Sequence, residues 1–427
     1  MTLLLVTIIF LFVKRKVKIS ISRKTLFWGS IIFLTVLLIL KILFLDNIAA
    51  SEGMSENQHF LAIFKHFLGY PTILAMFSSI TVPFGISFVN SAQILNLIFS
   101  ILIVFLLYKS IVNFSNKKIA SIAIILYAFF PSQIFYVAIP SAETTYLFFI
   151  MLAVYLFSNF YKNREMGNEL SYLIPCIIFC SLAIFIRPQG IIFLIAICLC
   201  IFFIKGMKNK ITRLTFCICI FLIMNIFISA YTNFVVGQTA ASTTNGWSLY
   251  VGQNVRAKGR WNKKDAKVFD KYLHKVTKGK KTTSELQDYF FDRSIERINE
   301  NGAKIFSLIP QKFFYMWYED EVGYTSLIDM SPDKEKNSFM FNSFRGLSTG
   351  YYLSCFVLLI FLVIKFFIKK KKEYNILVFL GSLYILGTII IHLIFEQAER
   401  YTFPCIVFIC IIIAILSVES VSDNSTD

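Results

Sequence analysis

The sequence predicts an all-α polytopic membrane protein with about 11 transmembrane helices and one long, mainly helical extracytoplasmic loop. Apolar residues make up 57% of the 427-residue chain, more than a soluble domain of this size carries. Ten apolar stretches are long enough to cross a bilayer, because about 20 residues at ~1.5 Å each span ~30 Å of hydrocarbon. Helices are expected because lipid offers the backbone no hydrogen-bond partners.

The first apolar stretch, residues 2–13, is short and is followed by Lys14, Arg15 and Lys16. A signal peptide has the reverse order, so we interpret this stretch as a short first span, with a trimmed gene start as the alternative. In chain order the predicted spans are 2–13, 25–45, 86–108, 119–139, 142–160, 170–186, 189–205, 214–236, 347–368, 374–395 and 401–417.

The loops between these spans predict the orientation of the chain. Every second loop is short and basic, which is typical of the cytoplasmic side. The basic residues of these five loops are Lys14/Arg15/Lys16/Lys18, Lys109/Lys117/Lys118, Lys162/Arg164, Lys205/Lys208/Lys210/Arg213 and Lys369 to Lys372. The extracytoplasmic side then receives 46–85, 140–142, 187–188, 237–346 and 396–400. We expect the protein in the plasma membrane, with its chemistry on this outer face.

The net charge of +17 does not indicate a nucleic-acid-binding protein, because most of the excess lies in loops that set topology. The chain has no aromatic-basic RNA motif, no zinc-spaced Cys/His set and no Walker sequence. Its nine cysteines all lie inside apolar stretches and are interpreted as small hydrophobic residues.

The predicted spans and loops divide the chain into three regions. These are 1–236 with the first outer loop 46–85, the extracytoplasmic loop 237–346, and 347–427 with a polar tail. Within 237–346, Ser284 as N-cap and Gln287 three residues later predict a helix that stops at Asn301-Gly302. The aromatic stretch 305–317 fits either the membrane interface or packing on the bundle, and we favour packing.

The first outer loop contains the first candidate for chemistry. Glu56 precedes a helix-like pattern that includes His59, and a carboxylate facing the membrane surface suits a general base, worth about 10²–10⁴-fold in rate. The alternative is structural: Ser55 caps a helix, and Glu56 favours its positive end.

Three further charged residues lie at predicted outer membrane boundaries. Glu143 follows Pro140 where a span begins, so it either stabilises a helix N-terminus or lines a site. Arg187, before Pro188, and Arg400, before Tyr401, either reach lipid headgroups or hold phosphate oxygens through their guanidinium forks. Pairing with nearby glutamates is the other alternative for Arg400.

The segment 245–262 mixes glycines, amides and indole rings, which suits a polar ligand with apolar faces. Asn254, Arg260 and Trp261 are its candidate substrate-binding residues. Just beyond, residues 256–281 hold 11 basic and 2 acidic residues. This is either a solvated face or a surface for an anionic headgroup or wall polymer.

Taken in order, four motifs resemble bacterial glycosyltransferases of the GT-C superfamily, in particular protein O-mannosyltransferases and the aminoarabinose transferase of lipid A. The likeness covers about residues 50–415 and depends on the order and common sidedness of the motifs. They are Ser55-Glu-Asn-Gln-His-Phe60, Tyr127 to Phe148 with its Pro131 and Ser141-Ala-Glu143, Ile186-Arg-Pro-Gln-Gly190, and Glu399-Arg-Tyr-Thr-Phe-Pro404.

The resemblance implies a polyprenyl-phosphate sugar donor and an inverting transfer to an envelope glycan, lipid or protein, with no nucleic acid involved. It places the base at Glu56, with His59 among the substrate contacts. The family residue is usually Asp, so Glu52 and Asp46 remain rivals. It also implies that Glu143 lines the site and that Arg187, Arg400 and Tyr401 bind the donor phosphate. Relatives differ in metal use, so a divalent cation stays open, although no metal cage is visible in the sequence.

Two other classes remain. An O-antigen-type polymerase or ligase would use outer arginines without a first-loop base. A transporter or flippase tends to carry internal repeats and mid-membrane charges. The predicted spans have almost no mid-membrane charge, and Lys41 lies close enough to an outer end to reach the surface. The sugar, the acceptor and the oligomeric state stay open.

Overall fold

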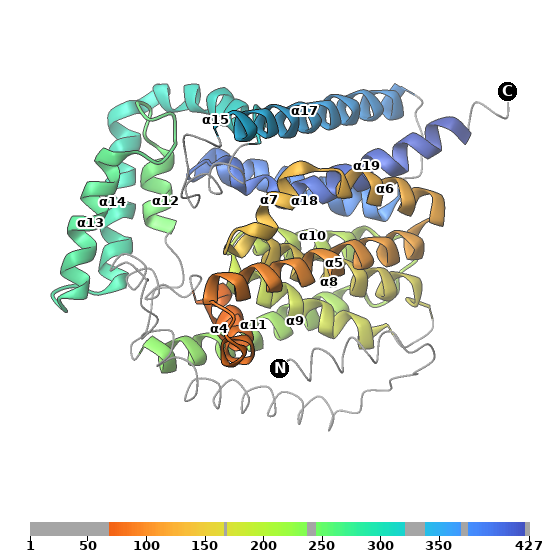
Figure 1. Cartoon of the computed structure of the whole chain (residues 1–427), viewed down its shortest axis with the longest axis horizontal. Helices are drawn as coiled ribbons and strands as arrows, with labels where there is room; N and C mark the ends of the chain where they lie inside the picture. The colour runs from red at the N-terminus through yellow and green to blue at the C-terminus, as the bar shows by residue number, and fades with distance from the viewer. Residues whose placement is uncertain (1–67, 166–168, 237–244, 321–337, 369–374, 423–427) are drawn as a thin grey trace.

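The computed structural model describes residues 68–165, 169–236, 245–320, 338–368 and 375–422. Within these ranges every regular element is a helix, as expected from the sequence. The long helices lie side by side in a bundle, and a group of shorter helices caps one end of it (Figure 1). The predicted spans 2–13 and 25–45 and the first outer loop up to residue 67 lie outside the described residues.

The described chain begins with α4 (Gly69–Thr81), a helix that the sequence analysis did not anticipate. The short η2 (Val82–Phe84) follows it and leads to α5 (Phe88–Phe114), where the Ser87 side chain accepts a hydrogen bond from the Asn90 amide. The predicted span 119–139 is two helices, α6 (Lys117–Ala128) and α7 (Pro131–Ala138), which meet at 60°. Pro131 explains the break, since it has no amide hydrogen and disfavours helix at the preceding residue.

The next four helices are α8 (Ala142–Lys162), α9 (Leu170–Ile186), α10 (Gly190–Phe203) and α11 (Lys210–Val236). Helix α8 is the centre of the bundle: 83% of its apolar window is buried, and it packs mainly against α5 and α9. By contrast only 17% of the window in α11 is buried. An apolar helix that the described part of the chain leaves largely uncovered fits a lipid-facing position.

The shorter helices at one end of the bundle are here called the outer group, because the sequence predicts that this end is extracytoplasmic. They are α12 (Asn245–Gly252), α13 (Lys263–Thr277), α14 (Thr283–Asn301), η3 (Gly302–Ser307) and α15 (Leu308–Trp317). The expected helix is present as α14 and stops at Gly302, but the N-cap predicted at Ser284 is wrong. Thr282 caps the helix in a reciprocal capping box with Glu285, since Glu285 is the residue three places on from Thr282.

A separate small core joins α13 to α14. Its residues are Phe269, Leu273, Val276, Leu286 and Phe290. The aromatic stretch 305–317 ends in α15, whose Met316 and Trp317 are buried in the main core. The preference for packing on the bundle is therefore confirmed for this end of the stretch.

The chain returns to the bundle with α17 (Ser338–Ile368), α18 (Ile376–Ile394), η4 (Glu399–Tyr401) and α19 (Phe403–Ser422). Five described helices are long and apolar enough to cross a membrane, or six if the bent α6–α7 pair is one span. Three shorter apolar helices, α9, α10 and the apolar part of α19, accompany them. These helices coincide with nine of the predicted spans, and the protein is a multi-pass membrane protein.

Candidate functional site

A buried ion pair joins two corners of the bundle. Glu143 lies in the first turn of α8, directly after the Pro140-Ser141 corner, and Arg187 is the C-cap residue of α9. The Arg187 Nη2 donates to Glu143 Oε1, and both side chains are largely buried. The sequence placed both residues at outer boundaries, and the fold brings them into direct contact although 44 positions separate them.

Arg400 approaches the same carboxylate from a third corner. It lies in η4, between α18 and α19, and it is exposed, unlike Glu143 and Arg187. Glu143 interacts electrostatically with Arg187 and also with Arg400. The two guanidinium groups expected to bind phosphate therefore converge on one carboxylate.

Tyr401, the next residue, stacks on His392 with ring centroids 4.2 Å apart and planes 6° from parallel. The His392 Nδ1 lies 3.0 Å from the Glu396 carbonyl oxygen. These contacts tie η4 to the last turn of α18. Tyr401 thus holds the segment that carries Arg400.

Two further polar side chains belong to this region. The buried Tyr136 of α7 interacts electrostatically with Glu143, Arg187, Arg400 and Asp320. Asp320 follows α15 and accepts a 2.7 Å hydrogen bond from Ser348 Oγ. Burial raises the pKa of Asp320 to about 6. A second carboxylate therefore acts on Tyr136 together with Glu143, and it has no cation of its own among the described hydrogen bonds and ion pairs.

Lys312 of α15 ties the outer group to the end of α18. Its buried Nζ donates to the carbonyl oxygens of Leu393, Ile394 and Phe395 at 2.9, 3.3 and 2.8 Å. These carbonyls lie at the helix C-terminus, where intrahelical partners are missing and a positive charge is favourable. Burial lowers the pKa of Lys312 to about 7, and the Glu396 carboxylate acts in the opposite direction.

Backbone contacts add to this connection. The Glu396 amide donates to the Ser248 carbonyl at 2.8 Å, and the Gln397 amide donates to the Gly259 carbonyl at 3.1 Å. A Cβ on Gly252 would lie 2.5 Å from the Phe395 carbonyl carbon. Glycine is required there because the two backbones approach so closely.

The three candidate substrate-binding residues of this segment have different surroundings. The Asn254 side chain donates to Asp265 Oδ2 at 2.7 Å and accepts from the Ala257 amide. Arg260 pairs with Glu399, the neighbour of Arg400, at 2.5 Å. Asn254 thus organises its own loop, Arg260 joins that loop to η4, and Trp261 is 57% exposed and open to a ligand.

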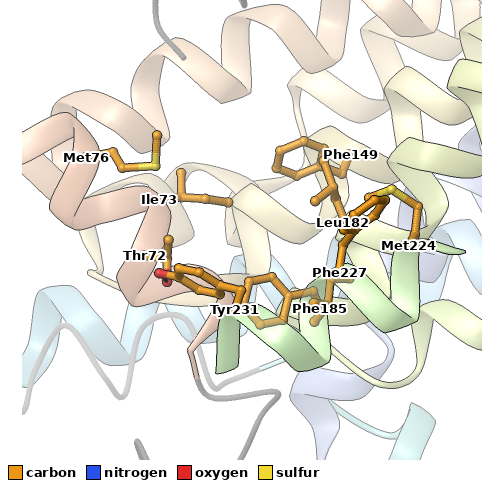
Figure 2. A pocket seen from close by; sticks show the side chains of 10 residues that line it. Thr72, Ile73, Met76, Phe149, Leu182, Phe185, Met224, Phe227 and Tyr231 are labelled. Atoms are coloured by element: carbon orange, nitrogen blue, oxygen red, sulfur yellow. Dashed lines mark hydrogen bonds between the residues drawn. The ribbon is translucent and has the colours of Figure 1, made fainter. Parts of the chain in front are cut away.

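An apolar pocket lies between four helices of the bundle (Figure 2). Its volume is about 50 Å³, and side chains from α4, α8, α9 and α11 line it, among them Phe149 and Phe185. Phe185 is two residues before Arg187. Thr72 and Tyr231 close one side of the pocket through a 2.9 Å hydrogen bond between their hydroxyls. The pocket thus shares helices α8 and α9 with the Glu143–Arg187 pair.

The candidate base lies elsewhere in the chain. Glu56, its rivals Glu52 and Asp46, and His59 all fall outside the described residues. Among the residues that the structure describes, no group of three or more His, Cys, Asp or Glu side chains forms a metal site.

Comparison with known families gives one result that bears on the site. Residues 64–231 match the family model described as dolichyl-phosphate-mannose-protein mannosyltransferase, a family of the GT-C superfamily. The matched region carries both Glu143 and Arg187. This match supports the resemblance over residues 64–231, which contain the motifs Tyr127 to Phe148 and Ile186 to Gly190. Comparison with curated proteins and with solved structures gave no significant match.

Sequence reasoning missed Tyr136, Asp320, Lys312 and His392. Lys312 carried a usable signal, since it is a lone lysine inside the aromatic stretch 305–317 that was expected to pack on the bundle. A lysine at such a position needs acceptors around it. The other three carry no comparable signal, because their surroundings come from helices far away in the chain.

Proposed function

We propose that this protein transfers a sugar from a polyprenyl-phosphate donor to a cell-envelope acceptor on the extracytoplasmic face, with inversion at the anomeric carbon. The observation that carries the proposal is the convergence of Arg187 and Arg400 on Glu143. The predicted topology puts this end of the bundle outside the cell. Two guanidinium groups at a membrane boundary suit a lipid-linked phosphate.

The free hydrogen-bonding groups of the site support this assignment. The Arg187 Nη2 donates a hydrogen bond to Glu143, while the buried Arg187 Nε has no hydrogen-bond partner within the described structure. A buried donor left without an acceptor is costly, so a ligand oxygen would satisfy it. In this proposal Glu143 orients Arg187, and the exposed Arg400 supplies the second contact to the phosphate.

The apolar pocket supports a lipid-linked donor over a soluble sugar nucleotide. Its lining is almost wholly apolar and comes from helices α4, α8, α9 and α11. A short part of an isoprenoid chain could lie there while the phosphate stays near Arg187. Burial of apolar surface would then contribute to donor binding at about 25 cal/mol per Å².

The proposed reaction is a single displacement. Glu56, with Glu52 and Asp46 as rivals, takes the proton from an acceptor hydroxyl. The hydroxyl oxygen forms a bond to the anomeric carbon as the bond to the phosphate oxygen breaks on the opposite side. The leaving polyprenyl phosphate carries the electron pair, and Arg187 and Arg400 stabilise its growing negative charge.

Purified protein in liposomes would test the donor chemistry. Polyprenyl-phosphate mannose, glucose and aminoarabinose are offered in turn with water as the acceptor, and the polyprenyl phosphate released by hydrolysis is measured. We expect Arg400→Gln and Arg187→Gln to lower release at least about 100-fold, since each removes charge stabilisation from the transition state. The control is Arg293→Gln, because Arg293 is exposed and its contacts with Glu296 and Tyr289 stay within α14.

Two outcomes would contradict the proposal: undiminished release when both arginines are replaced, or movement of label across the bilayer without a new glycosidic bond. The second outcome would favour a transporter.

Glu56→Gln should abolish transfer while donor binding persists. A polymerase or ligase would instead tolerate Glu56→Gln. Comparison of envelope glycans with and without the gene would identify the acceptor.

A further inference from the structure

Helix α13 carries a row of lysines along one side. Lys264, Lys267, Lys271 and Lys275, here called the lysine stripe, are all exposed. At 100° per residue they fall within an arc of about 80° and extend over about 17 Å of the helix. Phe269, Leu273 and Val276 lie on the opposite side of α13, in the small core with α14.

The acidic residues near the stripe do little to neutralise it. Asp265 is buried, and it accepts hydrogen bonds from Arg297, Asn254 and Asn262. Although burial alone would raise the pKa of Asp265, these bonds hold it below its ordinary value, so its charge is matched internally. Asp270 is the one exposed acid on α13. Among the described ion pairs, no stripe lysine has an acidic partner.

The arrangement of α13 argues against contact with the bilayer. A helix that lies in a membrane interface needs an exposed apolar face, whereas that of α13 is covered by α14 and by Trp247 and Tyr250 of α12. In Figure 1, α13 and α14 stand at the end of the bundle, with α12 between them and the long helices. The stripe is opposite the face packed on α14 and so points away from the bundle.

The stripe starts close to the candidate site. Asn262 caps α13, with its side chain accepting from the Asp265 amide. The exposed Trp261 precedes it, and Arg260 pairs with Glu399 beside Arg400. A linear ligand held along the stripe would therefore have one portion at Trp261, near η4.

We propose that the lysine stripe binds the acceptor, and that this acceptor is a linear polymer with closely spaced phosphate groups. This inference rests on the proposed function, because only a transferase has an acceptor. Binding of a polymer to the stripe can nevertheless be measured without any transfer. Successive stripe lysines are separated by about 4.5–6 Å along the helix axis, which suits a chain of repeated anionic groups.

The test uses the full chain in detergent, with fluorescent inorganic polyphosphate and poly(glycerol phosphate) as probes. The variant changes Lys264, Lys267, Lys271 and Lys275 to Gln. The matched control changes the exposed Lys117, Lys118, Lys205 and Lys208 to Gln, which removes the same charge at the other end of the bundle. We expect the stripe variant to bind at least about tenfold more weakly, the control to match the wild type, and binding to weaken with added salt.

Equal affinities for the two variants would overturn the proposal, because the effect would then be one of net charge alone. Stripe-dependent binding to phosphatidylglycerol vesicles in preference to both polymers would also overturn it, in favour of a membrane surface. All eight lysines are exposed, so both variants should fold, and matching thermal unfolding curves would verify this. Normal donor cleavage by the stripe variant, with lost polymer binding, separates this proposal from the proposed function.

Discussion

The Glu143–Arg187 pair illustrates what one buried contact contributes. Removing one partner of a buried pair leaves an uncompensated charge, which costs about 3–5 kcal/mol. We therefore expect Glu143→Ala to lower the free energy of unfolding by about this amount, and Glu143→Ala with Arg187→Met to recover part of it. Denaturant unfolding in micelles measures both. If the double variant loses the sum of the two single losses, the residues are not energetically coupled.

Lys312 should make stability depend on pH. Its folded pKa of about 7 lies below the unfolded value of 10.5, so the unfolded chain binds more protons between these values. The stability contributed by Lys312 therefore rises with pH through this window. Lys312→Met leaves the carbonyls of Leu393 and Phe395 without this donor, so the variant should be less stable. The gap in Tm should widen from pH 7 to pH 10, and a constant gap would contradict the assignment.

Asp320 should show the opposite dependence. Burial raises its folded pKa to about 6, above its ordinary value of 3.8, so the folded chain binds more protons between pH 4 and 6. The wild type should gain stability as the pH falls through 6, and Asp320→Asn should lack this gain. Asn still accepts from Ser348, so the variant should fold. Thermal unfolding from pH 4.5 to 7.5 measures the difference between the two proteins.

At the scale of elements, the hydropathy of the sequence correctly predicted where several of the apolar helices begin and end. The ends of α9 match the predicted span, and α8 and α18 differ from theirs by no more than two residues. Hydropathy works because a membrane helix satisfies its own backbone and needs only an apolar run. It missed α4, which is short, and the α6–α7 bend, whose Pro131 lies within an apolar stretch. The Thr282 cap was missed because Thr282, Thr283 and Ser284 are all good capping residues.

The site was predictable in part for a related reason. Glu143, Arg187 and Arg400 are charges at boundaries of apolar runs, and a charge there is conspicuous in the sequence. Their convergence was not predictable, because it depends on how α8, α9 and α18 pack. Likewise, Asn254 looked suited to a ligand, but its partner Asp265 lies on a helix whose position the sequence does not reveal.

Close packing between elements gives a prediction at this scale. Gly252→Ala would place a Cβ against the Phe395 carbonyl, so α12 and the segment leading to Arg400 must separate. We expect donor cleavage to fall at least about tenfold, since small displacements of a positioned charge are costly in catalysis. Gly350→Ala is the control, because its Cβ would meet nothing within 4 Å. Equal activity of the two variants would show that the α12 contact does not position Arg400.

At the scale of the whole molecule, the proposal requires the outer helices and the three charged corners to share one side of the membrane. In Figure 1 the α12–α14 group lies at one end of the bundle, and the α5–α6 turn lies at the other. This arrangement agrees with the alternation of basic loops along the sequence. It also means that a single labelling experiment can test the orientation of the entire chain.

Lys280→Cys, in the turn after α13, and Lys118→Cys, at the start of α6, are suitable probes because both positions are exposed. A membrane-impermeant maleimide should label Lys280→Cys in intact cells and Lys118→Cys only after the membrane is opened. The wild type is the background control, since its nine cysteines all lie within apolar helices and should not react. Labelling in the reverse order would place the arginines on the cytoplasmic side. Transfer to an envelope acceptor from this site would then be impossible.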